Sequence, residues 1–227
     1  GEEIRIVERA QRSLRDKEKL YYATEGNKLK ISYTKPHIVS FFFSLPRKQL
    51  EIQIPAALAD KLNNLEVDSA SADITVRELS VRELSLQSAS GNLTANSLVC
   101  DKLSFESVSG DTRAERIRTE KLDAETVSGD VVLSGRFSIL DMEGVSGRLS
   151  AIAESCPTEL DVNTVSGDIT LSIPENDGFA VRYSKVSGNF LCDFPTRQDG
   201  NRAVYQNGGA DFRMETVSGD LIIQKHE

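Results

Sequence analysis

An acidic or amide residue follows a glycine at a regular interval along this chain of 227 residues. The column formed by the residue after each glycine position is Asp73, Asn92, Asp111, Asp130, Arg148, Asp168, Asn189 and Asp220. Asp and Asn side chains accept hydrogen bonds from backbone N–H groups, which favours turn capping as their role. Ca²⁺ prefers several oxygen ligands, so Asp111 and Asp130, as direct neighbours in the column, are the alternative candidates for a calcium site. The Gly-Gly-x-Gly-x-Asp nonapeptide of calcium β-rolls is absent, which favours no metal.

A serine precedes every glycine position. The column is Ser71, Ser90, Ser109, Ser128, Ser146, Ser166, Ser187 and Ser218. Eight identical serines cannot all be nucleophiles, because each would need a positioned base, and both histidines lie outside the repeats. A hydroxyl ladder satisfied from repeat to repeat is the favoured interpretation. The common hydrolase, zinc and nucleotide motifs are also absent, so we predict a protein that is not an enzyme and uses no cofactor.

The glycines themselves mark an internal repeat. They are Gly91, Gly110, Gly129, Gly147, Gly167, Gly188 and Gly219, preceded by a degenerate copy with Ala72. The first three intervals are 19 residues, and the next four are 18, 20, 21 and 31 residues. Glycine tolerates positive φ, so the chain can turn sharply at each copy. We therefore expect a corner at every Ser-Gly pair.

Apolar residues alternate on both sides of each corner. They stand seven and five residues before the glycine, as in Leu103 and Phe105, and two and four residues after it, as in Val131 and Leu133. A spacing of two is typical of a strand with one buried face. Each repeat is thus expected to be strand, corner, strand and a polar return, and only stacked repeats could bury the apolar faces.

These patterns predict an all-β fold, a single-stranded parallel β-solenoid of about eight rungs of ~19 residues with an N-terminal β-rich cap. Residues 65–227 form the solenoid, with an insertion at about 193–211 that we expect to be a protruding loop or hairpin. A leucine-rich repeat is the rival architecture, but its repeats usually run 20–29 residues and carry Asn in the turn.

Residues 1–64 lie outside the clear repeat and are expected to cap the open end of the solenoid. Ile4, Val7, Ala10 and Leu14 are at helical spacing and fit a short helix, and a strand around residues 4–7 fits equally well. Residues 20–23 and 29–33 predict a hairpin, and residues 40–45 and 50–54 predict further strands. The candidate binding residues are aromatic: Phe41, Phe42 and Phe43 in this region, with Phe194 and Tyr205 in the insertion.

Charge is unevenly distributed. Residues 1–50 contain 11 Lys and Arg against 6 Asp and Glu, whereas residues 51–227 contain 16 against 29. The acidic body argues against a nucleic-acid partner. The basic start could lie near an anionic membrane surface or simply be a solvated segment.

The Val-Ser-Gly-Asp turns at 108–111, 127–130, 165–168 and 217–220, together with the strand columns, resemble the bacterial β-strand-repeat family labelled "putative adhesins". The Leu-Glu-Ile-Gln-Ile-Pro stretch at 50–55 is similar to that family's lead-in strand. The resemblance implies a place at the cell envelope, and some relatives are linked to envelope stress.

Three functional hypotheses follow. The first is a non-enzymatic, envelope-associated binding or adhesion module of a bacterium, whose ligand is a protein or glycan at the envelope or a host surface. The second is a structural or regulatory partner protein in the envelope-stress response. The third is a polysaccharide-active β-helix enzyme, which would need clustered carboxylates on one solvent face. An envelope or extracellular location, with any anchor outside this chain, fits the first two.

Overall fold

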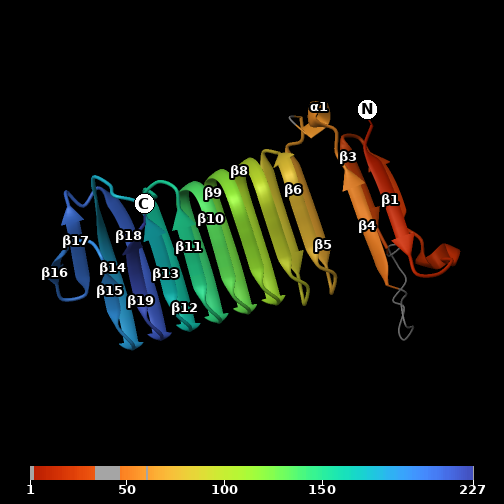
Figure 1. Ribbon diagram of the computed structural model, residues 1–227. Helices are drawn as coiled ribbons and strands as arrows, with labels where there is room; N and C mark the ends of the chain where they lie inside the picture. The colour runs from red at the N-terminus through yellow and green to blue at the C-terminus, as the bar shows by residue number, and fades with distance from the viewer. Residues whose placement is uncertain (1–2, 34–46, 60, 227) are drawn as a thin grey trace. The chain divides into compact units, whose positions relative to one another are not determined.

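The computed structural model describes residues 3–33, 47–59 and 61–226, and nearly all of its regular structure is β (Figure 1). The chain divides into two compact units, residues 1–58 and residues 59–227. In the first unit the elements are β1 (Arg5–Ala10), the 3-10 turn η1 (Asp16–Glu18), β2 (Tyr21–Glu25), β3 (Lys28–Ser32), β4 (Lys48–Gln53) and the first residues of α1 (Ala56–Ala59). No described helix is long and apolar enough to cross a membrane.

The N-terminal unit is built from two small antiparallel pairs. β1 pairs with β4, so the strand alternative for the start of the chain is right and the helix alternative is wrong. β2 and β3 form the predicted hairpin around Gly26. Between β1 and β2, the buried carboxylate of Glu18 binds the guanidinium groups of Arg12 and Arg15 at 2.9 and 2.7 Å. The predicted strand at residues 40–45 lies outside the described residues, and the capping role of this unit stays a proposal.

The second unit is the predicted parallel β-solenoid. Its strands are β5 (Asn64–Ser69), β6 (Ile74–Ser80), β7 (Glu83–Ser88), β8 (Leu93–Ser109), β9 (Thr112–Ser128), β10 (Val131–Ser146), β11 (Leu149–Ala153), β12 (Glu159–Ser166), β13 (Ile169–Ile173), β14 (Gly178–Ser187), β15 (Phe190–Cys192), β16 (Arg197–Asp199), β17 (Arg202–Gln206), β18 (Ala210–Ser218) and β19 (Leu221–Lys225). Equivalent positions of successive repeats pair in register, as Leu84 with Leu103 and Leu122 with Leu103. The repeat period therefore equals one coil.

The core consists of the apolar columns that the alternation predicted. Leu103, Phe105, Leu122 and Leu133 are at most 1% exposed, and the corresponding residues of the other central coils are equally buried. Burying an aliphatic side chain contributes about 1.5–3 kcal/mol. One coil cannot bury its own apolar face, so this stabilisation exists only in the stack.

The corners bring the backbones of neighbouring coils into close contact. A Cβ atom placed on Gly129 would lie 2.3 Å from the carbonyl oxygen of Gly110, and φ at Gly129 is +133°. Both the space and the conformation exclude a side chain. Glycine is therefore required at this corner for two reasons: its backbone has a positive φ, and the neighbouring coil leaves no space for a side chain.

The predicted polar return after the second arm is wrong. β8, β9 and β10 continue through it as strand, and Leu98, Ile117 and Phe137 in this segment are buried. The chain bends there at a second corner six residues after the glycine, where Ser97 and Arg116 have φ of 56° and 54°. The apolar alternation did not predict this strand, because its apolar residues follow a register that shifts beyond the bend.

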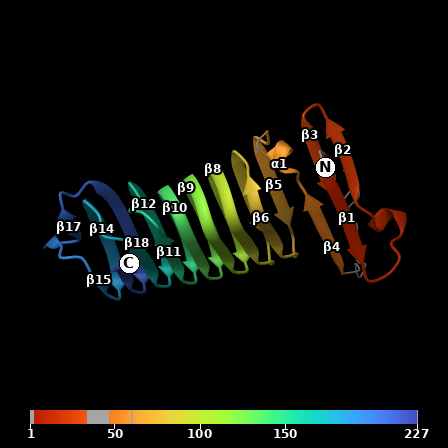
Figure 2. The same cartoon turned by 45° about the horizontal axis from the view of Figure 1, so that its top comes forward.

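The C-terminal coil is stacked out of sequence order. β18 pairs with β12 on one side and with β14 on the other, and β19 lies in the same way between β13 and β15 (Figures 1 and 2). The last repeat of the sequence thus lies between the two repeats before it. Because of this order, Asp168 and Asp220 are direct neighbours in the column after the glycine, in addition to Asp111 and Asp130, which the sequence predicted.

The insertion at about 193–211 supplies the hairpin β16–β17, which continues the sheet. β17 pairs antiparallel with β14, and β16 pairs with β17. Beneath it, Phe179 stacks on Phe212 at 5.2 Å between ring centroids and contacts Phe194 at 5.3 Å and Tyr205 at 5.6 Å. The hairpin therefore covers the edge of β14 and closes the aromatic end of the core.

Replacement of a corner glycine should separate the coils. We expect Gly129→Ala to lower the free energy of unfolding by about 3 kcal/mol or more, because the new methyl group overlaps the Gly110 carbonyl. Gly200→Ala is the control, since Gly200 also has positive φ but has no atom within 4 Å of its Cβ position. That variant should lose only about 1–2 kcal/mol from left-handed strain. Urea denaturation followed by circular dichroism measures both, and equal losses would contradict the close-contact argument.

Candidate functional site

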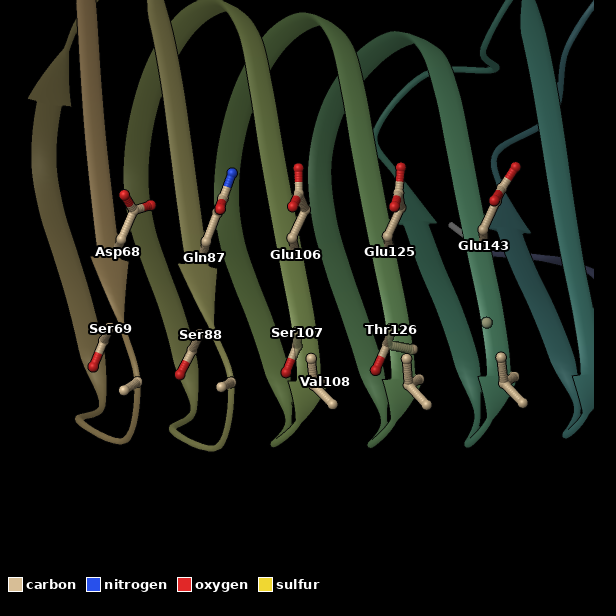
Figure 3. A pocket seen from close by; sticks show the side chains of 15 residues that line it. Asp68, Ser69, Gln87, Ser88, Glu106, Ser107, Val108, Glu125, Thr126 and Glu143 are labelled. Carbon is tan, nitrogen blue, oxygen red and sulfur yellow. The ribbon is translucent and has the colours of Figure 1, made fainter. Parts of the chain in front are cut away.

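A shallow groove crosses the coils on the outward face of the arms that precede the glycines (Figure 3). It consists of two adjoining hollows of about 580 and 340 Å³, which share Glu143 and Gly144. Its lining comes from three positions of each repeat, namely four, three and two residues before the glycine. We call it the axial groove, because equivalent residues of successive coils follow one another along it.

A row of exposed valines forms one side of the axial groove. It runs through Val108, Val127, Val145, Val165, Val217 and Val186 in their stacking order. The first five are 48–54% exposed and Val186 is 82% exposed. Strand alternation turns these side chains outward, away from the core. The row is thus a continuous apolar surface that folding leaves in contact with water.

Acidic and amide side chains form the other side of the groove. In Figure 3 they point the same way from successive coils, in the order Asp68, Gln87, Glu106, Glu125 and Glu143. The row continues through Asn163 and Glu215 to Ser184. Glu106, Glu125 and Glu143 are on adjacent coils in register, about 4.8 Å apart in the backbone. Among the described ion pairs, none involves these three carboxylates.

A second acidic column lies beside this row, two residues earlier in each strand. It contains Asp123, Asp141 and Asp161 on three adjacent coils. Asp123 binds Lys121 at 3.0 Å and Lys102 at 3.2 Å. The pKa of Asp141 is raised above its ordinary value, first by burial and then by the carboxylates of Asp123, Asp161 and Glu143. The field of the acidic face is therefore only partly neutralised by the protein's own cations.

Between the two sides, a column of hydroxyl residues points toward the corner. The hydroxyl of Ser88 accepts a hydrogen bond from the N–H of Gly91 at 2.8 Å, and that of Ser107 donates to the carbonyl of Gly110 at 3.2 Å. Thr126 and Thr164 are only 5% and 6% exposed, and their hydroxyl oxygens have no hydrogen-bond partner in the structure. These hydroxyls stabilise some corners and leave polar groups unsatisfied at others.

The three rows of the axial groove were not identified from the sequence, although their signal was present. Aligning the repeats on glycine places Val or Ala two residues before it in every copy, and Ser or Thr three residues before it in most. The valines were treated as part of the turn motif, because the sequence does not show on which face of a corner a side chain emerges.

The serine column does not form the predicted hydroxyl ladder. Its side chains are exposed, and Ser90 is the member whose hydroxyl donates to the preceding coil, at Ala70, in the described part of the chain. The carbonyl groups of the serines connect the coils instead. The N–H of Gly110 donates to the carbonyl of Ser128 at 3.2 Å, and Gly129 and Gly147 repeat the arrangement. Any side chain with this backbone would serve, so the hydroxyl itself carries little of the coil-to-coil bonding.

The column after the glycine forms a side-chain ladder between coils. Oδ1 of Asp111 accepts a hydrogen bond from the N–H of Asp130 at 3.0 Å, and Oδ1 of Asp130 accepts one from the N–H of Arg148 at 2.8 Å. Asn92 plays the same part toward Asp111 at 2.9 Å. The ladder breaks at Arg148, because an arginine side chain has no hydrogen-bond acceptor. These residues therefore cap amides of the next coil, rather than of their own turn.

This ladder bears on the calcium candidates. Asp111 and Asp130 each use one carboxylate oxygen on a backbone amide. Within residues 3–33, 47–59 and 61–226 no three His, Cys, Asp or Glu residues are grouped in a way that could hold a metal ion. The calcium hypothesis stays a prediction, and the structure gives both carboxylates a turn-linking role.

The aromatic binding candidates are not brought together. Phe41, Phe42 and Phe43 lie outside the described residues. Phe194 and Tyr205 are 3% and 6% exposed within the aromatic end of the core, and the hydroxyl of Tyr205 donates to Glu175. Their predicted binding role is untested, but their observed role is packing.

The cysteines offer no activated nucleophile. Cys100, Cys156 and Cys192 are free thiols, and burial raises the pKa of each, to about 11 for Cys156. A thiol with a raised pKa is neutral at pH 7 and therefore unreactive. Cys100 is a small residue of the buried core, whereas Cys156 and Cys192 are only half-buried.

Removing one step of the ladder should destabilise the stack. We expect Asp130→Ala to lose about 1–3 kcal/mol, because the Arg148 amide loses a charged acceptor. Asp130→Asn keeps an oxygen at the same place, as Asn92 already shows, and should lose less than half as much. Thermal denaturation of both variants measures these losses of stability. If the Asn variant were as unstable as the Ala variant, the hydrogen bond from Asp130 to the Arg148 amide would be excluded as the cause of the loss.

Neutralising Asp141 should stabilise the protein. Since the raised pKa of Asp141 means that its ionisation disfavours the folded state, Asp141→Asn should raise the urea midpoint at pH 7. The gain should shrink as the pH falls through the raised pKa toward the ordinary value of 3.8, where the native carboxyl also becomes neutral. Asp199→Asn, an exposed site outside the groove, is the control and should give no comparable gain. A gain that does not depend on pH would contradict this account.

Comparison with known proteins gives one structural likeness and one family match. One solved structure with some likeness is titled a putative cell adhesion protein from Clostridium sporogenes; it is 15% identical, with a TM-score of 0.35, over 92% of this chain and 76% of that chain. No curated protein matches the sequence. The model of the family described as Toastrack DUF4097 matches residues 1–224. Since the match spans almost the whole sequence, the chain belongs to the Toastrack DUF4097 family.

Proposed function

We propose that this chain is a non-enzymatic binding module of a bacterial cell envelope, and that the axial groove is its binding surface. The observation that carries the proposal is the row of half-exposed valines aligned across the coils. Contiguous apolar surface on a soluble domain usually marks an interaction site. Strand propensity alone does not require valine there, because threonine has a similar shape and preference without exposing a second methyl group.

The groove suits an elongated partner. Each coil presents the same three positions at a step of about 4.8 Å, so a partner with its own repeat can make the same contact several times. Many weak equivalent contacts add up when one partner makes them simultaneously. This supports binding of a chain-like molecule rather than a small ligand in an enclosed pocket.

The same regularity gives little support to catalysis. An acid–base pair needs two groups whose environments separate their pKa values. Glu106, Glu125 and Glu143 occupy equivalent positions in successive coils, which makes them chemically alike. The placement at the cell envelope derives from the resemblance to the adhesin-labelled repeats, and it is part of the proposal.

A pull-down from detergent-solubilised bacterial envelope tests the proposal. The baits are the intact chain, a groove variant with Val127→Thr and Val145→Thr, and a control with Val99→Thr and Ile152→Thr. The control residues are 51% and 42% exposed and lie outside the groove, so both variants remove similar apolar surface. We expect a component that the intact chain and the control enrich and the groove variant loses. Recovery that is the same with all three baits, or absent with all of them, would reject the axial groove as the binding surface.

A further inference from the structure

The axial groove has an excess of negative charge in the free protein. Glu106, Glu125 and Glu143 follow one another on adjacent coils without an ion pair in the described structure, and Asp141 lies beside Glu143 on the same strand. Like charges about 5 Å apart repel by roughly 1 kcal/mol or more, depending on the local dielectric. The fold could relieve this repulsion with Gln or Asn, as it does at Gln87 and Asn163 in the same row. The central coils keep the carboxylates, which favours a partner that supplies the missing positive charge.

The partner must also cover the valines. Along a strand, the acidic row and the valine row are two residues apart, or about 6.6 Å. Lys and Arg combine an aliphatic stem with a charged end, and they commonly lay the stem on apolar surface while the charge reaches a polar group. A basic side chain crossing the groove can therefore contact Val127 with its stem and Glu125 with its charge. A purely ionic partner would leave the valines exposed.

Other polymers fit less well. None of the residues that line the groove is aromatic, so it offers no flat face on which a base would stack. Nucleic acid and anionic lipid are also repelled by the carboxylates. A peptide supplies cationic side chains, apolar side chains and an extended backbone together.

We propose that the axial groove binds an extended peptide segment rich in Lys and Arg, which lies across the coils along the solenoid axis. This inference rests on the proposed function and names the ligand class of the same surface. The eight stacked positions of the acidic row, about 4.8 Å apart, span roughly 34 Å, which corresponds to about ten residues of extended chain. A segment of that length would neutralise the acidic row and bury the valine row in a single contact.

The test measures binding of fluorescent dodecapeptides by anisotropy. The probes are (Lys-Ala)6 and (Glu-Ala)6, and the proteins are the intact chain, a groove variant with Glu125→Gln and Glu143→Gln, and a control with Glu120→Gln and Glu154→Gln. The control carboxylates are exposed, lie outside the groove lining and have no ion pair in the described structure. Both variants therefore lose the same net charge.

We expect (Lys-Ala)6 to bind and (Glu-Ala)6 not to bind. The groove variant should weaken (Lys-Ala)6 binding by about tenfold or more, whereas the control should stay within about twofold. Val127→Thr with Val145→Thr should also weaken binding, since the stems lose their apolar contact. Equal losses in the groove and control variants would show non-specific attraction to the acidic body and would overturn the inference, as would no binding of (Lys-Ala)6.

The two proposals can fail separately. If (Lys-Ala)6 does not discriminate between the variants but the envelope component is still lost with the valine variant, the groove is a binding surface and the basic-peptide class is wrong. If the envelope component is also independent of the valines, the proposed function fails together with the inference. Binding of (Lys-Ala)6 that depends on both the carboxylates and the valines supports both.

Discussion

Close approach of backbone to backbone at the Ser-Gly corners is the constraint on which the rest of the solenoid depends. At Gly219 a Cβ atom would lie 2.1 Å from the carbonyl of Gly167, and at Gly129 it would lie 2.3 Å from that of Gly110. This contact fixes where each coil turns relative to the one below. Because the corners coincide, every other position of the repeat also stacks on its equivalent, and the buried leucine columns and the hydrogen bonds between coils form together.

In-register stacking has an electrostatic consequence. Identical positions become neighbours about 4.8 Å apart, so any ionisable column must repel itself or find partners. The column after the glycine finds them, since the carboxylates of Asp111 and Asp130 accept hydrogen bonds from backbone amides of the next coil. The outward carboxylates of the axial groove have no such amide to bind. The structure therefore keeps an unfavourable interaction on the same face where it also exposes its valines.

The ends of a solenoid present a different difficulty, because a free strand edge can pair with other chains. Here the C-terminal coil is intercalated, so that β14 rather than the last strand of the sequence lies outermost, and the hairpin β16–β17 pairs with its edge. The aromatic rings of Phe179, Phe194 and Tyr205 fill the space beneath. The long last interval of the sequence thus supplies the hairpin that closes this end.

The sequence by itself determined the repeat, its period, the strand alternation and the corners, since each depends on local spacing of apolar residues and on the backbone freedom of glycine. Only the tertiary structure decided the order of the last coils, because β18 could have paired with β14 or β12 on local grounds alone and in fact pairs with both. It likewise decided that Val127 and Glu125 form a groove while Phe194 is buried. Stacking joins residues that are 18 or more positions apart, and which face they share depends on the curvature of the whole coil rather than on any local pattern.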